Sequence, residues 1–255
     1  MGMFKKEICC VCGKKAGLLQ RTKLEDDQYL CINCSVNYCS SFLKRGNYTK
    51  EQIMEHMDNL KKHEELYINE FKKDGIFKFH GKGITISFSD ELGLFSIYYD
   101  DEGQKFHEMF RYDQISNYYI RTETDVNDAV KLSRVDVVLE LENHPYCDKI
   151  RIMCAIKQNE MQTVKETVAE PLIKKLDEIF GKPHEEIKEK IRSNLTIGLG
   201  GINISTAGIA KMSKFIKNGL GEDESVKENE KFVRNNRTQY TQRANETEKK
   251  YGITI

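Results

Sequence analysis

Residues 9 to 34 read CCVCGKKAGLLQRTKLEDDQYLCINC, and this stretch contains two Cys-x-x-Cys pairs separated by eighteen residues. In each pair, the two intervening residues form a tight turn that directs both sulfur atoms toward one ion. Two such turns complete a tetrahedron, so the spacing predicts one zinc ion per chain with four thiolate ligands. The predicted ligands are Cys9, Cys12, Cys31 and Cys34.

Several neighbouring residues bear on this prediction. Gly13 follows the first pair, where the turn needs a positive φ. Lys14 and Lys15 lie beside the site and offset the roughly two negative charges that four thiolates leave around a divalent ion. Cys10 lies outside the pattern. Cys39 could replace one ligand, although its offset of five residues from the second pair favours a position on a helix.

The same stretch resembles a small zinc-ribbon family of unknown function found at the N-terminus of bacterial and phage proteins. In that family CxxCGKK, a Gly-Leu-Leu and a Lys-Leu-x-Asp stretch precede a second CxxC, and all of these are present here. The resemblance covers about residues 7 to 45. It implies a zinc-binding module without a settled activity.

Composition favours a reducing, aqueous location. The 40 basic and 40 acidic side chains cancel, so no overall field attracts nucleic acid or membrane. Charged residues near the N-terminus leave no room for the apolar core of a signal peptide, and no segment is apolar enough to span a bilayer. Eight cysteines without a secretion signal are more typical of metal binding than of disulfides, and we expect a cytoplasmic protein.

Residues 48 to 74 form the second predicted unit, a helical spacer after the zinc ribbon of residues 1 to 45. Thr49 and Gln52 occupy capping-box positions, and Gly75 ends the helix. Its apolar stripe is expected to pack against the chain itself, and a self-associating coiled coil that forms a homo-oligomer is the alternative. His56 and His63 are expected to face solvent. The stripe contains Ile53, Met57, Leu60, Tyr67, Ile68 and Phe71.

Residues 75 to 182 form the third predicted unit, in which apolar residues alternate with a period of two. Three runs each place apolar side chains on one face, which predicts half-buried antiparallel strands. These runs are ITISF, RVDVVLELE and KIRIMCAI. NHPYCD between the last two runs predicts a hairpin turn. The stretch MQTVKETVAEPLIKKLDEIFG predicts a closing amphipathic helix that ends at Gly181, with a kink or break at Pro171.

This layout, with the phrases YDQISNYYI and VVLELENHPYCDKIRI, resembles the bacterial pleckstrin-homology-like domains. The resemblance implies an α+β fold with a bent antiparallel sheet or barrel capped by its C-terminal helix. Some members of the broader fold bind inositol phosphates at the first hairpin. The corresponding turns here contain Asp90, Glu91, Asp100, Asp101 and Glu102, which would repel phosphate.

Residues 183 to 255 form a C-terminal extension. Its segment STAGIAKMSKFIKNGLG predicts a basic amphipathic helix that docks on the protein's own surface or, alternatively, lies on an anionic membrane. The residues after Gly221 are highly polar and predict a mobile helix or disorder. The candidate membrane or partner contacts are Lys211, Met212, Lys214, Phe215, Ile216 and Lys217.

Three classes of function remain to be compared. The best catalytic candidates are His144, Cys147 and Asp148. All three are residue types expected in a hairpin turn, so we do not expect the protein to be an enzyme. Nucleic-acid binding is the alternative function, since residues 1 to 50 carry a net charge of +5. The negative charge of the metal site and of the acidic KLEDDQ loop opposes it. The sequence favours a non-catalytic, zinc-stabilised scaffold whose partner is another protein.

Overall fold

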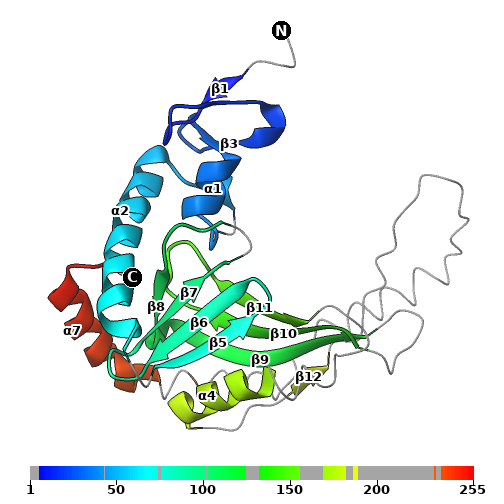
Figure 1. Ribbon diagram of the computed structural model, residues 1–255, viewed down its shortest axis with the longest axis vertical. Coiled ribbons are helices and arrows are strands. Elements are labelled where there is room, and N and C mark those ends of the chain that lie inside the picture. The colour runs from blue at the N-terminus through cyan, green and yellow to red at the C-terminus, as the bar shows by residue number, and fades with distance from the viewer. Residues whose placement is uncertain are drawn as a thin grey trace, which may run out of the picture.

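The structure is a computed structural model that describes residues 6–42, 44–73, 76–100, 103–124, 132–155, 169–181, 186–188, 233 and 237–255. It contains both helices and antiparallel sheets, in agreement with the expected α+β class. A small N-terminal head stands at one end of the molecule, two sheets form the body, and helix α2 runs from one to the other (Figure 1).

The head, residues 6–42, consists of two short hairpins and one helix. Strand β1 pairs with β2, and β3 pairs with β4, both antiparallel. Strands this short bury little apolar surface, so the head needs a further source of stability. Its elements are β1 (Glu7–Ile8), β2 (Lys15–Ala16), the 3₁₀ turn η1 (Leu18–Gln20), β3 (Arg21–Lys23), β4 (Tyr29–Cys31) and α1 (Ile32–Tyr38).

Helix α2 (Lys50–Leu66) follows the 3₁₀ turn η2 (Arg45–Asn47) and begins with the predicted capping box. Thr49 Oγ1 accepts from the Gln52 N–H at 3.3 Å, and Gln52 Oε1 accepts from the Thr49 N–H at 2.8 Å. A π-helical turn, η3 (Tyr67–Phe71), continues the helix. Most of the expected stripe packs within the chain, and the buried members are Ile53, Met57, Leu60, Tyr67 and Phe71.

Two expectations about this helix are wrong. Ile68 is 49% exposed, because the wider π-helical turn rotates its side chain out of the stripe. His56 and His63 are each 3% exposed and do not face solvent. Both histidines lie three or four residues from buried members of the stripe, so helical geometry places them on the buried face despite their polarity.

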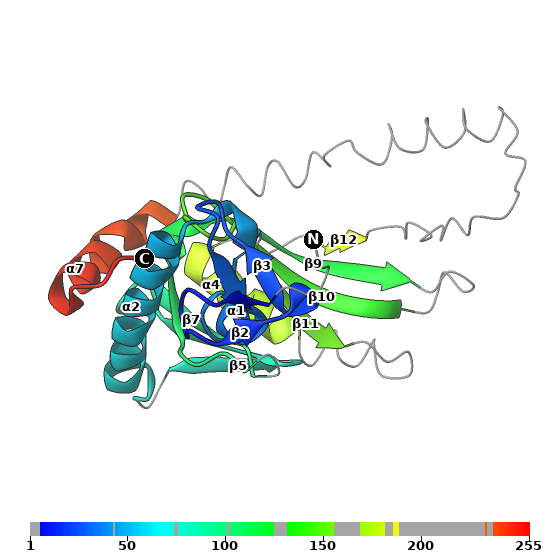
Figure 2. The ribbon, with the colours of Figure 1, turned by 90° about the horizontal axis from the view of Figure 1, so that it is seen from above.

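The body contains two four-stranded sheets, in the orders β5-β6-β7-β8 and β11-β10-β9-β12. Neighbouring strands are antiparallel except β12, which runs parallel to β9. In Figure 2, β9 and β10 extend beyond the rest of the body. The strands are β5 (Phe77–Gly81), β6 (Ile84–Ser89), β7 (Leu94–Tyr98), β8 (Glu108–Arg111), β9 (Ile115–Thr124), β10 (Leu132–Leu141), β11 (Lys149–Ala155) and β12 (Glu186–Lys188). A 3₁₀ turn, η4 (Tyr112–Gln114), joins β8 to β9.

The predicted strands are present, but the expectation that they are half-buried is wrong for β6 and β10. Ser87, Asp136 and Val138 of the opposite face are buried as well, because other parts of the chain cover both faces. The predicted hairpin is β10–β11, and residues 142–148 form its turn. Cys154 is half-buried, and Ile156 lies outside the described residues. The residues predicted to face inward that are buried are Ile84, Ile86, Phe88, Val135, Val137, Leu139, Leu141, Ile150 and Ile152.

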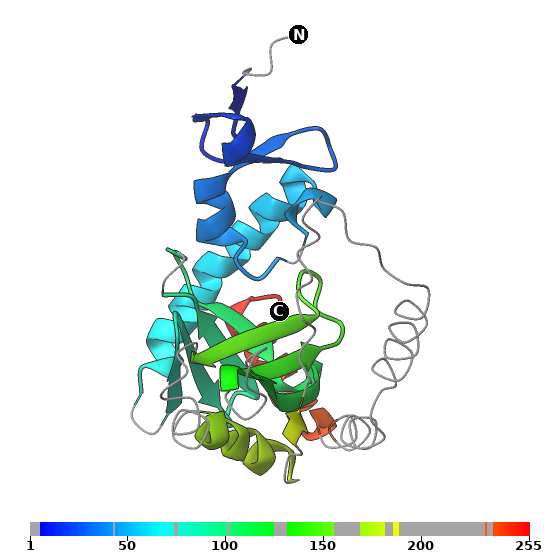
Figure 3. The ribbon, with the colours of Figure 1, turned by 90° about the vertical axis from the view of Figure 1, so that its right-hand side faces the viewer.

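Helix α4 (Glu170–Phe180) covers the sheets on the side away from the head (Figures 1 and 3). Pro171 stands in its first turn, where the missing N–H costs nothing, so this described part of the helix has no proline in its interior. Gly181 ends the helix with φ 74°, as predicted. Val164 and Val168 lie outside the described residues. The buried face contains Leu172, Ile173, Leu176, Ile179 and Phe180.

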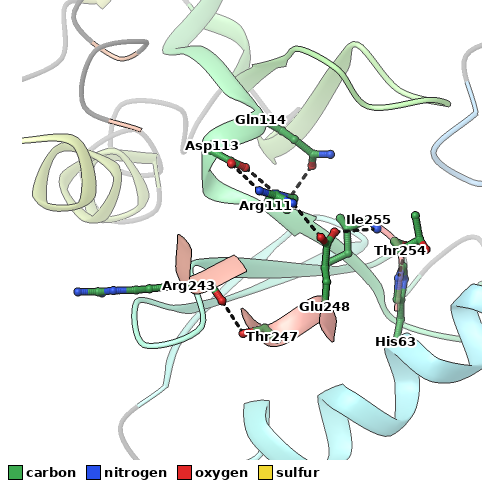
Figure 4. Close-up of polar contacts among 9 residues, drawn as sticks. All are labelled: His63, Arg111, Asp113, Gln114, Arg243, Thr247, Glu248, Thr254 and Ile255. Carbon is green, nitrogen blue, oxygen red and sulfur yellow. Dashed lines mark hydrogen bonds and ion pairs between the residues drawn. The ribbon is translucent and has the colours of Figure 1, made fainter. Parts of the chain in front are cut away.

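The C-terminal segment is ordered against α2 and the body (Figure 4). It contains the 3₁₀ turn η7 (Thr238–Tyr240) and helix α7 (Thr241–Tyr251). Arg111 Nη1 donates to Glu248 Oε2 at 2.9 Å, and His63 Nε2 lies 3.2 Å from Thr254 O. Buried Ala244 and Ile253 join apolar side chains of α2 and the first sheet in one cluster. The tail thus completes a core to which two other elements contribute.

Candidate metal centre

The first cysteine pair lies on the turn that joins β1 to β2. The Cys9 N–H donates to Lys14 O at 2.9 Å, and the Gly13 N–H donates to Cys9 O at 2.9 Å. Gly13 has φ 70°, the left-handed conformation predicted at this position. This closed turn leaves Cys9 buried and Cys12 exposed.

The second pair lies where β4 passes into α1. Cys31 ends β4 and is the N-cap of α1, and Cys34 lies in the first turn of that helix. The Cys34 N–H donates to Cys31 Sγ at 3.5 Å, and the Cys31 N–H donates to Cys9 Sγ at 3.3 Å. Backbone N–H groups directed at sulfur orient the sulfur atoms and stabilise their anionic form.

All four sulfur atoms converge. They lie within 4.8 Å of one another, and the Sγ atoms of Cys12 and Cys31 are 3.7 Å apart. A tetrahedral zinc site with bonds of ~2.3 Å separates its sulfur atoms by about 3.8 Å. The donors therefore fit one tetrahedral metal ion. Within the described part of the chain, no second group of three or more potential ligands occurs.

Burial makes neighbouring thiolates costly unless a cation compensates them. For Cys9, burial opposes ionisation most, but N–H donors, chiefly those of Cys12 and Cys31, outweigh it and lower the thiol's pKa to about 7. Burial raises the pKa of Cys31, and it raises that of Cys34 much further. A bound divalent ion removes this cost, because a coordinating thiol is deprotonated outright.

The remaining cysteines of the head are not part of this group. Cys10 is half-buried, its N–H donates to Tyr29 O at 2.8 Å, and burial raises the pKa of its thiol. Cys39 is fully buried at the C-terminal end of α1, and burial raises its pKa to about 12. The converging group contains neither sulfur, so the geometry provides no support for Cys39 as an alternative ligand.

The acidic loop between β3 and β4 attaches the head to α2. Asp26 Oδ2 accepts from the Lys50 N–H at 2.9 Å, which places a carboxylate at the positive end of the helix. Asp27 forms an ion pair with Lys23. The Glu25 N–H donates to the backbone oxygen of Tyr48, just before α2, so Glu25 and Asp26 lie on the α2 side of the head.

An aromatic cluster joins the head to the body. Phe42 of the head stacks on Tyr146 of the β10–β11 turn, with ring centroids 4.4 Å apart and planes at 7°. Tyr146 also contacts His56 edge-on, with ring centroids 4.8 Å apart. The turn that sequence analysis treated as a simple connection thus contacts both the head and α2.

The three catalytic candidates lie on this same turn. His144 Nδ1 accepts from the N–H groups of Tyr146 and Cys147 at 3.3 and 3.1 Å, so its lone pair is already engaged. Cys147 Sγ donates to Lys149 O at 3.3 Å, and burial raises the thiol's pKa to about 12. Asp148 is exposed. These contacts hold a turn together and do not form a nucleophile with its base.

Sequence analysis missed a buried polar pair at the same junction. Glu108 of β8 is 2% exposed and accepts from Ser41 Oγ at 2.8 Å. Its Oε1 lies 3.7 Å from Nε2 of buried His56, and that nitrogen has no hydrogen-bond partner among the described residues. Burial raises the pKa of Glu108 to about 7 and lowers that of His56 to about 3. An acidic residue in a short strand is more typical of a solvent-facing position, so no sequence signal marked the pair.

Comparison with known proteins adds one finding. The family described as Domain of unknown function (DUF4428) matches residues 7–56, which cover most of the head and the start of α2. All four converging cysteines lie in the matched segment, in agreement with an N-terminal CxxC zinc-ribbon-like family. Searches of curated proteins and of solved structures found no match.

The candidate membrane or partner contacts of the C-terminal extension lie outside the described residues. These are Lys211, Met212, Lys214, Phe215, Ile216 and Lys217. Among the helices that the structure describes, none is long and apolar enough to cross a membrane.

Proposed function

We propose that this protein is a zinc-stabilised, non-catalytic scaffold of a reducing compartment such as the cytoplasm, and that it presents surfaces to another protein. The convergence of four cysteine sulfur atoms carries the proposal. Four protein ligands fill a tetrahedral site, whereas a catalytic zinc ion keeps one position open for water or substrate. The metal would therefore hold the head together without performing chemistry.

The donor set supports zinc as the metal. Thiolates are soft ligands, and a tetrahedral set of four sulfur atoms is typical of zinc or an iron–sulfur centre. Cys9, Cys31 and Cys34 are buried, and backbone N–H groups approach the sulfur atoms of Cys9 and Cys31. A head built from strands of two or three residues gains the stability it lacks when such a site is filled.

The body supports a binding role without phosphate recognition. Its seven antiparallel strands followed by an amphipathic helix are compatible with the pleckstrin-homology-like fold that the sequence resembles. The β6–β7 turn exposes Asp90 and Glu91, and Asp100 follows β7. Lys175 Nζ lies 2.7 Å from Asp90 Oδ2 and compensates that charge, so Glu91 and Asp100 supply most of the repulsion of a phosphate group, and we propose a protein partner for the body.

Affinity capture after nuclease treatment tests the proposal. Tagged full-length protein is compared with Cys31→Ser, which removes a ligand, and with Cys10→Ser, which leaves the four predicted ligands in place. We expect a nuclease-resistant protein partner that the intact chain and Cys10→Ser retain and that Cys31→Ser loses. Capture that depends on nucleic acid would instead support the nucleic-acid-binding alternative and refute the scaffold.

A further inference from the structure

The head has exposed aliphatic side chains that do not pack in its core. Six large apolar side chains are exposed among the described residues, and four of them belong to the head. The other two, Met54 and Ile68, lie on α2 and η3. We call the four head residues the tip: Ile8 (60% exposed), Leu18 (56%), Leu19 (93%) and Ile32 (52%).

The tip residues lie on consecutive, paired elements. Ile8 is opposite Lys15 across β1–β2, and the 3₁₀ turn η1 presents Leu18 and Leu19 between β2 and β3. Ile32 directly follows β4, the partner of β3. In Figure 1, β1 and β3 lie at the end of the molecule opposite α4, and α1, which begins at Ile32, lies between them and the body. The two leucines of the Gly-Leu-Leu stretch lie in the 3₁₀ turn between these hairpins and are exposed.

Positive charge accompanies the tip. Lys14 and Lys15 are exposed on the turn and strand beside it, and neither forms an ion pair with another described residue. The acidic loop that could neutralise them attaches to α2, through the contact between Asp26 and Lys50. A filled four-thiolate site adds about two negative charges, which these two lysines offset. Apolar contact must therefore supply most of the binding, and the lysines act as local contacts for lipid phosphates.

We propose that the tip binds an anionic lipid surface, with its aliphatic side chains in the headgroup boundary and Lys14 and Lys15 at the lipid phosphates. Aliphatic side chains next to lysines are typical of protein surfaces that lie in this boundary. Protein interfaces favour Trp, Tyr and Arg and are depleted in Lys, and single-stranded nucleic acid is bound by aromatic stacking. The four tip residues are all aliphatic, and the nearby ring of Tyr29 is only partly exposed, with the Arg21 guanidinium over it at 4.7 Å.

A second copy of the chain is a poor occupant of the tip. A symmetric contact through this surface would bring the lysines of both copies together, and their repulsion would oppose the apolar gain. Binding to lipid through the tip leaves the body and α7 facing away from the surface (Figure 1). The inference goes beyond the proposed scaffold function and stands independently of it, since it concerns a different surface.

Vesicle flotation of the full-length, metal-loaded protein tests the proposal. The probes are phosphatidylcholine vesicles with and without phosphatidylserine, at low and high salt. We expect flotation only with phosphatidylserine, weakened by salt. The double variant Leu18→Ser/Leu19→Ser should reduce binding at least about tenfold, because it removes two exposed aliphatic groups from the lipid contact. Each of Lys14→Gln and Lys15→Gln should reduce it about fivefold.

Matched variants separate the tip from other sites. Ile68→Ser removes an exposed apolar group elsewhere and should leave flotation unchanged, and metal content and circular dichroism verify that every variant is folded. The variant Lys211→Gln/Lys214→Gln/Lys217→Gln probes the C-terminal segment. No flotation of the intact chain, or flotation that persists in the leucine double variant, overturns the proposal, as does a loss confined to the C-terminal variant.

Discussion

The head and the body achieve stability in different ways. Among the residues that the structure describes, the main apolar cluster of the body contains 26 buried ones, drawn from both sheets, α4 and the C-terminal segment. The corresponding cluster around the head contains ten, and three of these are the candidate ligands Cys9, Cys31 and Cys34. Apolar burial can hold the body together, whereas the head has few buried apolar side chains besides the three candidate ligands, so a bound metal would add stability that apolar burial does not supply. The predictions below separate these two sources of stability.

Removal of the metal should have the largest effect, and it should be confined to the head. Cys34→Ser is expected to lower bound zinc from about one equivalent per chain to a small fraction, because three thiolates no longer close the site. The head should then become sensitive to limited proteolysis while the body still unfolds cooperatively. Metal analysis, proteolysis and thermal melts measure these outcomes.

Cys10→Ser is the matched control for that experiment. The residue neighbours a ligand, but its sulfur is not in the converging group, so metal content should not change. A greater loss of zinc with Cys10→Ser than with Cys34→Ser would show that the assigned register of the first pair is incorrect.

Deletion of residues 237–255 should destabilise the body and leave metal content unchanged. The deletion uncovers contacts made by buried Tyr240 and Ile253, and burial of two such side chains contributes roughly 3–6 kcal/mol to the free energy of unfolding. Chemical denaturation measures the change. Asn245→Ala, at an exposed position of α7, is the control. Equal stability of the deleted and intact chains would mean that the tail adds nothing to the core.

Glu108→Gln should change how stability depends on pH. The carboxyl pKa is about 7 in the folded state, against 4.5 as its ordinary value, so the folded state holds this proton more tightly. The contribution of Glu108 is therefore most favourable below pH 4.5 and declines as pH rises through 7, at a cost of up to about 3 kcal/mol. Glutamine removes that decline, and its side-chain oxygen can accept from Ser41 Oγ as Glu108 Oε1 does.

Denaturation of both proteins between pH 4.5 and 8 measures this effect. The variant and the parent should have similar stability near pH 4.5, and the variant should be the more stable at pH 8. Buried, neutral His56 has a pH dependence of the opposite sense, because it lowers the free energy of unfolding as pH falls below 6.5. This contribution is present in both proteins. The other groups near Glu108 are Ser41, Cys39, Tyr146 and Cys147, which burial keeps neutral over this range. A constant difference between the two proteins across the range would contradict the assignment.

Tyr146→Ala should have the smallest effect and should act between the two regions. Loss of the stacking on Phe42 is expected to weaken the attachment of the head by about 1 kcal/mol, while zinc remains bound. Faster amide exchange in the head at unchanged metal content measures this weakening. Tyr146→Phe keeps the ring and should behave as the parent, and an alanine variant with unaltered exchange would exclude a role for the stacking.

Local patterns predicted much of what the structure contains. The doubled Cys-x-x-Cys spacing led to the four converging sulfur atoms, because two short turns are enough to bring each pair together. The capping box at Thr49 and the hairpin of β10 and β11 were also predictable from neighbouring residues. Each of these features depends on contacts within a few residues or on one regular period.

Contacts between distant segments could not be predicted in this way. The burial of His56 and its approach to Glu108 involve residues far apart in the sequence, and polarity alone suggested the opposite environment for the histidine. Tyr146 looked like part of a simple turn until the fold brought Phe42 against it. The polar C-terminal residues gave no indication that Ala244 and Ile253 would complete a core.

Spacing and the geometry of single elements were thus enough to predict the converging cysteines, the start of α2 and the inward-facing residues of the strands. Tertiary structure alone decided which faces are covered. It buried two histidines, turned the acidic loop toward α2 and left Leu18 and Leu19 exposed at the end of the head. The physical reason is that burial is a property of what packs against a residue, and those partners lie in other parts of the chain.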